Sequence, residues 1–150
     1  MSAQNFSVSV KVLEGYVFQV DFGDFGRMIT DEDAPLGTGE GPNPARMLAA
    51  AVVNCLTASL LFAIRKHKAE PGDITATIEG SVTRVDKRMR IETLDATLHL
   101  DADTSMLPEL DKALAQFENF CTVTQSVRAG IAVNVTVVDK DGKVLHRDQQ

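Results

Sequence analysis

A run without any charged side chain, from Met47 to Ile64, constrains the fold of this chain more than any other feature. Asn43 and Pro44 precede it as an N-cap and a first helical residue, so we predict a helix that runs from Pro44 to Lys68. A helix that is apolar on all sides must be buried, either in a protein core or in lipid. At about 37 Å, this helix is also too long for one small domain to cover alone, which points to a partner chain.

The same run approaches the length of a membrane-spanning helix, which needs roughly 18 or more apolar residues. Its composition argues against a membrane span, because it is rich in alanine rather than leucine and carries the polar side chains of Asn54, Thr57 and Ser59. The segments on either side of it have the amphipathic pattern of a soluble fold. We therefore expect a buried central helix and no membrane association.

Alternation of polar and apolar residues predicts strands on both sides of the helix. The expected strands before it are residues 7–12, 16–22 and 27–30, and those after it are residues 74–85 and 91–100, paired antiparallel. The C-terminal third predicts helices over 108–119 and 122–129, a strand over 131–137, and a polar tail that frays from His146. The expected fold is α+β, in the order β-β-β-α-β-β-α-α-β, within a single domain that spans residues 1–150.

Composition and charge exclude several classes of function. Lys and Arg total 15 against 21 for Asp and Glu, a net charge of −6, so nucleic acid and anionic membrane surfaces are poor partners. The N-terminus lacks the basic and apolar regions of a signal peptide, and the chain has only two cysteines. We therefore expect a cytoplasmic protein, because small secreted folds usually carry more cysteine.

The two cysteines are the remaining candidates for chemistry, since the three histidines are scattered and no glycine-rich cofactor loop is present. We accordingly expect no metal and no cofactor. Cys55 lies in the middle of the predicted helix, where burial raises the pKa of a thiol. Cys121 is better placed for reactivity, because the amides of the short helix that follows it would favour a thiolate. The local sequence leaves two interpretations open, namely packing residues or a reactive thiol pair.

Three segments resemble the OsmC/Ohr family of osmotically inducible and organic hydroperoxide resistance proteins. They are the segment from Gly41 to Cys55, with Asn-Pro opening the helix, then Phe120-Cys121, and Ser126-Val127-Arg128-Ala129-Gly130. The resemblance implies an OsmC-like fold of mostly antiparallel sheets around the long helix, in an intertwined homodimer. It also implies a thiol peroxidase of oxidative stress defence, in which Cys55 attacks an organic hydroperoxide and Cys121 closes a disulfide. An external dithiol then restores both thiols.

The sequence departs from the family pattern at two positions. The family's peroxidases have a Glu directly after Asn-Pro, where this chain has Ala45, and an Arg in the first hairpin, where residues 12–16 have none. The candidates to replace them are Arg27 and Glu40, with Arg46 and Arg128 as further cations. Without a cation beside it, Cys55 would keep a pKa near the free-thiol value of about 8.5 and react slowly.

Two alternative functions follow from the same resemblance. One is a non-enzymatic OsmC-like dimer that binds a small apolar ligand and uses its cysteines for packing. The other is a thiol redox sensor, in which the disulfide between Cys55 and Cys121 changes a binding surface.

Overall fold

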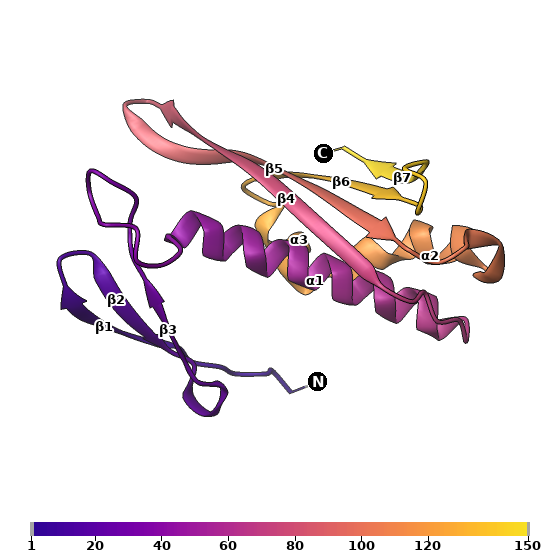
Figure 1. Ribbon diagram of the computed structural model, residues 1–150, viewed down its shortest axis with the longest axis horizontal. Coiled ribbons are helices and arrows are strands. Elements are labelled where there is room, and N and C mark those ends of the chain that lie inside the picture. The colour runs from indigo at the N-terminus through magenta and orange to yellow at the C-terminus, as the bar shows by residue number, and fades with distance from the viewer. Residues whose placement is uncertain (1, 150) are drawn as a thin grey trace. The chain divides into compact units, whose positions relative to one another are not determined.

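The chain forms two compact units in a computed structural model that describes residues 2–149. The N-terminal unit is Met1–Leu48 and the C-terminal unit is Ala49–Gln150. Each unit contains one β-sheet, of three strands in the first and four in the second (Figure 1). The single domain over residues 1–150 stays a prediction.

The N-terminal sheet is an antiparallel meander in the order β1-β2-β3, as the alternating sequence predicts. Its strands are β1 (Ser9–Glu14), β2 (Val17–Asp21) and β3 (Arg27–Thr30), with a short 3₁₀ helix, η1 (Gly23–Phe25), between the last two. Gly15 has a positive φ of 57° in the β1–β2 turn, a conformation that favours glycine. Val20, 4% exposed, is the one buried hydrophobic residue among those described in this unit.

A buried carboxylate organises the loop that follows β3. Asp31 is 2% exposed and accepts hydrogen bonds from the backbone amides of Glu32, Thr38 and Glu40 at 2.7, 3.0 and 3.1 Å. The Thr38 hydroxyl adds a fourth hydrogen bond at 2.8 Å. The hydrogen bond from Glu40, together with those from Thr38 and Glu32, outweighs burial and lowers the pKa of Asp31 to about 2. The loop is therefore ordered by one side chain near its start.

The long helix α1 (Pro44–Lys66) begins as predicted and ends two residues before the predicted end. Asn43 caps it, since its Oδ1 accepts a hydrogen bond from the Arg46 amide at 3.0 Å. By length and composition α1 could cross a membrane, a test that the core helix of a soluble protein also passes. One face of the helix is buried in the single chain, through Val52, Leu56, Ser59, Leu60, Ala63 and Ile64.

The C-terminal sheet has the order β4-β5-β6-β7 and packs with α1 in one hydrophobic core (Figure 1). Its strands are β4 (Ile74–Val85), β5 (Arg88–Leu100), β6 (Ala132–Val138) and β7 (Val144–Asp148). The β4–β5 pair is antiparallel, as predicted, and β5 pairs with β6 in parallel. Fully buried side chains on β5 and β6, such as Leu98 and Val135, form the centre of this core.

Parallel pairing of β5 and β6 requires a crossover connection, which here contains all the shorter helices of the unit. They are η2 (Thr104–Met106), α2 (Leu110–Gln116), η3 (Phe117–Phe120) and α3 (Thr122–Val127). The helix predicted over 108–119 therefore divides into α2 and η3, and Cys121 lies between η3 and α3.

The prediction that the chain frays from His146 is wrong, because the tail forms β7 and pairs antiparallel with β6. Contacts with residues distant in sequence hold it there. The His146 ring packs edge-on against Phe117, with centroids 5.3 Å apart, and its Nε2 lies 2.6 Å from Glu118 Oε2. The polar residues of this tail are thus partly buried by partners that the local sequence does not reveal.

Candidate thiol site

Cys55 lies on α1, where it is half-buried and lines an apolar pocket of about 390 Å³. The rest of the lining is Ala58, Ser59, Phe62 and Phe120. The two phenylalanine rings pack edge to face with centroids 5.4 Å apart, and the Lys66 ammonium lies 5.6 Å from the Phe120 centroid. The first thiol therefore faces a pocket suited to an apolar group.

Cys121 is fully buried and caps the helix that follows it. Its Sγ accepts a hydrogen bond from the Thr124 amide at 3.4 Å and donates one to Thr124 Oγ1 at 2.9 Å. Burial raises the pKa of the Cys121 thiol, and interaction with the adjacent Cys55 side chain raises it further. Both effects favour the neutral form of the second thiol.

The relative burial of the two thiols that the local sequence predicts is wrong. The hydrogen bonds with Thr124 lower the pKa of Cys121, as expected of a helix N-terminus, but burial outweighs them. Cys55, expected to be the more deeply buried thiol, is the more accessible of the two. Both cysteines are free, and their side chains lie next to each other. The structure thus brings together the two thiols that the sequence singled out.

The predicted supporting residues, Arg27 and Glu40, both belong to the N-terminal unit. Arg27 forms an exposed ion pair with Asp21, with 2.9 Å between Nε and Oδ2. Glu40 accepts a hydrogen bond from the Thr38 hydroxyl at 3.2 Å, while its backbone amide binds Asp31. Their assignment to the thiol site stays a prediction.

The two further cations are engaged elsewhere. Arg46 forms an exposed ion pair with Asp33 at 2.9 Å. Arg128 donates from one terminal nitrogen to Glu118 Oε1 at 2.7 Å and to the Val133 carbonyl at 3.0 Å. Its side chain is 9% exposed, so this guanidinium is committed to a carboxylate in the interior of the unit.

The sequence did not predict the buried cluster of ionisable side chains around Glu118. Burial raises the pKa of Glu118, but hydrogen bonds from His146 and Arg128, with a further one involving Asp148, outweigh burial and leave the pKa lowered. The Glu118 carbonyl also accepts a hydrogen bond from the Cys121 amide at 3.1 Å, so the cluster positions the turn that carries the second thiol. No sequence signal could have found it, because its members are 10 and 28 residues from Glu118.

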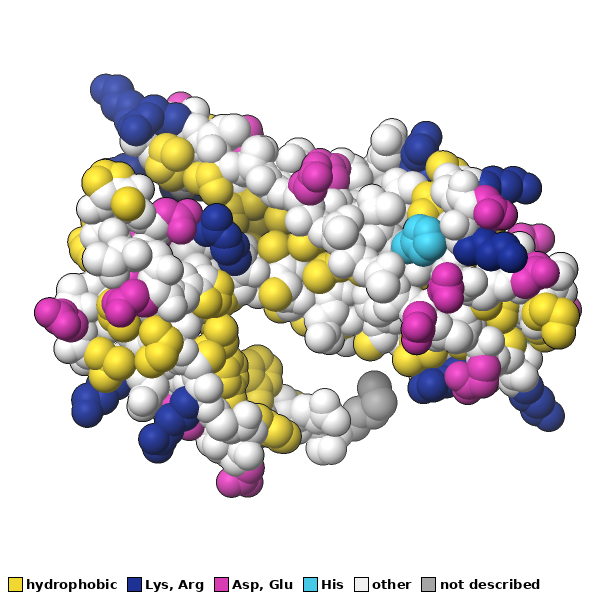
Figure 2. All heavy atoms as spheres, viewed as in Figure 1, with side chains coloured by type: hydrophobic (Ala, Val, Ile, Leu, Met, Phe, Trp, Pro, Cys, Tyr) yellow, Lys and Arg dark blue, Asp and Glu magenta, His cyan; other side chains and the backbone are white. Residues whose placement is uncertain are grey.

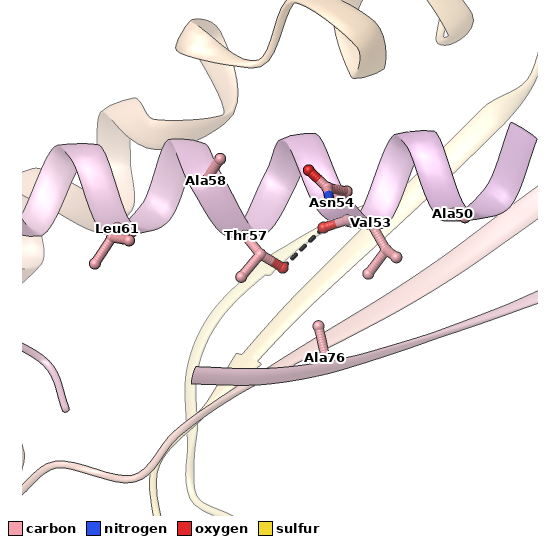
Figure 3. Close-up of a pocket in the computed structure, with 7 residues that line it drawn as sticks. All are labelled: Ala50, Val53, Asn54, Thr57, Ala58, Leu61 and Ala76. Carbon is pink, nitrogen blue, oxygen red and sulfur yellow. Dashed lines mark hydrogen bonds between the residues drawn. The ribbon is translucent and has the colours of Figure 1, made fainter. Parts of the chain in front are cut away.

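An open groove of about 520 Å³ runs along another face of α1 (Figure 3). Small or apolar side chains line most of it, with Ala76 of β4 on the far side, and the complete lining is Ala50, Val53, Asn54, Thr57, Ala58, Leu61 and Ala76. Ala50, Asn54 and Ala58 are exposed in the single chain. The long helix therefore has an uncovered side opposite its core face.

Within residues 2–149, no group of three or more His, Cys, Asp or Glu side chains is placed to hold a metal ion. An accessible thiol at an apolar pocket, with a second thiol beside it, can form a disulfide by way of an oxidised intermediate.

Comparison with known proteins relates the chain to one family. A family model described as OsmC-like protein matches residues 37–136. Among curated proteins, none matches the sequence.

Solved structures match over nearly the whole chain. An OsmC-like protein of unknown function from Vibrio cholerae aligns with a TM-score of 0.76 and 15% identity, over 91% of this chain and 100% of that one. The organic hydroperoxide resistance protein OhrB of Bacillus subtilis aligns with a TM-score of 0.65 and 20% identity, over 88% and 98%. An organic hydroperoxide resistance protein OsmC from Legionella pneumophila aligns with a TM-score of 0.67 and 18% identity, over 90% of this chain and 98% of that one. At these identities the structural matches establish the fold.

Proposed function

The chain belongs to the OsmC-like protein family, and on that premise we propose that it is a thiol-dependent peroxidase that reduces organic hydroperoxides in oxidative stress defence. One observation carries this proposal: an accessible thiol, Cys55, lies at an apolar pocket with the buried thiol of Cys121 beside it. The apolar pocket suits the tail of an organic hydroperoxide. Two of the matching structures described above are organic hydroperoxide resistance proteins.

The proposed reaction begins at Cys55. Its thiolate attacks the distal peroxide oxygen, an S–O bond forms and the O–O bond breaks. The sulfur loses two electrons to the peroxide and becomes a sulfenic acid, while the alkoxide leaves and is protonated to the alcohol. The Cys121 thiol then displaces the sulfenic oxygen, which leaves as water with the thiol proton, and a disulfide forms. An external dithiol reduces this disulfide and is itself oxidised.

We also propose that the working form is a cytoplasmic homodimer. Two uncovered apolar surfaces support the dimer. One is the groove along α1, and the other is β1, where Val10 and Val12 are 59% and 61% exposed although they alternate as core residues would. Hydrophobic side chains are visible on the surface of the N-terminal unit in Figure 2. Light scattering after gel filtration should give twice the mass of the chain, and a monomer at micromolar concentration would contradict the dimer.

Hydroperoxide consumption tests the activity. Purified protein with dithiothreitol should consume cumene hydroperoxide, and Cys55→Ser should leave only the uncatalysed rate. Cys121→Ser keeps a hydroxyl to cap α3 but cannot close the disulfide, so dimedone should label its Cys55 sulfenic acid after one turnover. Equal, slow consumption by the wild type and Cys55→Ser would reject the peroxidase.

A second candidate function is the binding of a small apolar ligand without chemistry. The wall of the Cys55 pocket favours it, because Ala58, Phe62 and Phe120 are apolar. This alternative predicts a Cys55 thiol that alkylates as slowly as an ordinary buried cysteine. Rapid alkylation of Cys55 in the native protein would exclude it.

A further inference from the structure

Ser59 lies one helical turn after Cys55 on α1 and lines the same pocket. It is only 6% exposed, and within the part of the chain that the structure describes its hydroxyl has no hydrogen-bond partner. Among the described residues, the one fully enclosed polar atom without a partner is Arg128 Nε, so the Ser59 oxygen keeps accessible surface of its own, on a residue that lines the pocket. A hydroxyl that is nearly buried and makes no hydrogen bond within the protein can donate to a molecule in that pocket.

Other serine and threonine hydroxyls on helices of this chain donate to the backbone carbonyl four residues earlier, whereas Ser59 does not. The Thr57 hydroxyl donates to the Val53 carbonyl at 2.8 Å, and the Ser126 hydroxyl donates to the Thr122 carbonyl at 2.9 Å. This bond to the carbonyl four residues earlier is the ordinary way for a helix to satisfy a serine or threonine. The equivalent acceptor for Ser59 is the Cys55 carbonyl, and the bond is not formed. The donor of Ser59 is therefore available to a molecule in the pocket.

The pocket lining combines two kinds of side chain. Cys55 and Ser59 of α1 supply a sulfur and a hydroxyl, while the rings of Phe62, also on α1, and Phe120 are apolar. A ligand that matches both kinds has an apolar body and a small polar terminus that can accept a hydrogen bond. An organic hydroperoxide has this form, with its two oxygens at one end of an apolar group.

We propose that Ser59 is a catalytic residue of the thiol site, whose hydroxyl donates a hydrogen bond to the peroxide oxygen that leaves when Cys55 attacks. This inference rests on the peroxidase function proposed above. Side chains four residues apart on a helix face lie about 5–6 Å apart at Cβ, which leaves room for a peroxide between sulfur and hydroxyl. As the S–O bond forms and the O–O bond breaks, negative charge collects on the leaving oxygen. Ser59 stabilises this alkoxide until water protonates it to the alcohol.

Two cations of the C-terminal unit bear on the need for such a donor. Arg128 is committed to Glu118 and the Val133 carbonyl, and the Lys66 ammonium lies at the Phe120 ring, 5.6 Å from its centroid. A hydroxyl that already lines the pocket can donate to the oxygen on which negative charge develops, which stabilises that charge. Ser59 can supply this stabilisation to the leaving oxygen without changing the thiol itself.

Two rates measured on the same variants test this role. We would compare wild type, Ser59→Ala and the matched control Ser126→Ala, which removes a serine hydroxyl from α3. The first rate is cumene hydroperoxide reduction in a single turnover, in which an oxygen leaves. The second is alkylation of Cys55 by iodoacetamide in the Cys121→Ser background, in which iodide leaves and only the thiolate matters.

We expect Ser59→Ala to reduce the peroxide about 100-fold more slowly. In the Cys121→Ser background, Ser59→Ala should leave the rate of Cys55 alkylation unchanged. The control Ser126→Ala should change neither the rate of peroxide reduction nor the rate of alkylation. A Ser59→Ala protein that reduces peroxide at the wild-type rate would overturn the inference and leave the peroxidase standing. An equal loss of both rates would also overturn it, because Ser59 would then act on the thiolate or the local fold. Wild-type protein without peroxide reduction would reject the peroxidase and this role together.

Discussion

The two units of this molecule hold their residues in place by different means. The C-terminal unit has a continuous hydrophobic core, to which α1, β5, β6 and the crossover helices contribute buried side chains, with partly buried ones from β4 and β7 packed against it. The N-terminal unit buries a single described hydrophobic residue, Val20, and leaves valines of β1 exposed. Each unit also buries a carboxylate. Asp31 is bound by amides and a hydroxyl from its own loop, whereas Glu118 is bound by the side chains of Arg128, directly after α3, and His146 of β7.

This difference separates local order from long-range order. A carboxylate served by neighbouring amides fixes only the loop around it. A carboxylate paired with an arginine and a histidine that are distant in sequence connects three segments of the chain. Its loss should therefore lower the unfolding free energy of the whole unit. We therefore expect the same kind of substitution to have global effects in the C-terminal unit and local effects in the N-terminal unit.

The largest effect is expected from Arg128→Met, which leaves Glu118 buried without its guanidinium. Breaking a buried ion pair on one side costs about 3–5 kcal/mol of unfolding free energy. The control Arg46→Met breaks an exposed pair with Asp33 in the N-terminal unit and should cost no more than about 1 kcal/mol. Urea denaturation at pH 7 measures the unfolding free energy of both variants. Equal losses would contradict the expected difference between the two units.

The pH dependence of the same variant tests whether the ion pair stabilises the fold only while Glu118 is ionised. Because the pKa of Glu118 is lowered in the folded chain, its ion pair stabilises the fold above the ordinary Glu pKa of 4.5. That contribution is lost as the pH falls below this value. The deficit of Arg128→Met relative to wild type should therefore shrink in acid.

A pair of Leu→Ala substitutions gives the next largest effect. Leu98 is fully buried on β5, and its truncation should cost about 2–5 kcal/mol. Leu13 is 48% exposed on β1, and its truncation should change the unfolding free energy by less than about 0.5 kcal/mol in the monomer. Thermal and urea unfolding compare the two. A large loss at Leu13 would mean that a partner chain covers β1.

The smallest and most local effect is expected at Asp31. Its carboxylate stabilises the loop above the ordinary Asp pKa of 3.8, and this stabilisation is lost as the pH falls through about 2. The amide signals of Thr38 and Glu40 in nitrogen–proton correlation spectra should titrate with a midpoint near pH 2, while the β5 amides should not. Asp31→Asn should abolish this titration, and a persistent midpoint would assign it to another carboxyl group.

The sequence predicted those parts of the fold that depend on local pattern. Alternation located β4 and β5, and the Asn43-Pro44 pair located the start of α1. It could not locate β7, because His146 and Asp148 look solvent-exposed until Glu118 is brought to them. The cysteines were found by elimination and given their expected roles by the family resemblance, whereas the greater burial of Cys121 depends on a crossover that local pattern does not describe. Ser59 looked like an interruption of an apolar run, and its unpartnered hydroxyl became evident only in the pocket.

The parallel pairing of β5 with β6 has a consequence for the order in which the site is assembled. During synthesis Cys55 emerges 66 residues before Cys121 (121 − 55 = 66). The crossover that carries Cys121 is closed only when β6 docks beside β5, which cannot occur before residues 132–138 have been synthesised. A nascent chain therefore passes through a stage in which the first thiol has no partner. A sulfenic acid formed at that stage has no resolving thiol, and further oxidation to the sulfinic acid is irreversible for most proteins.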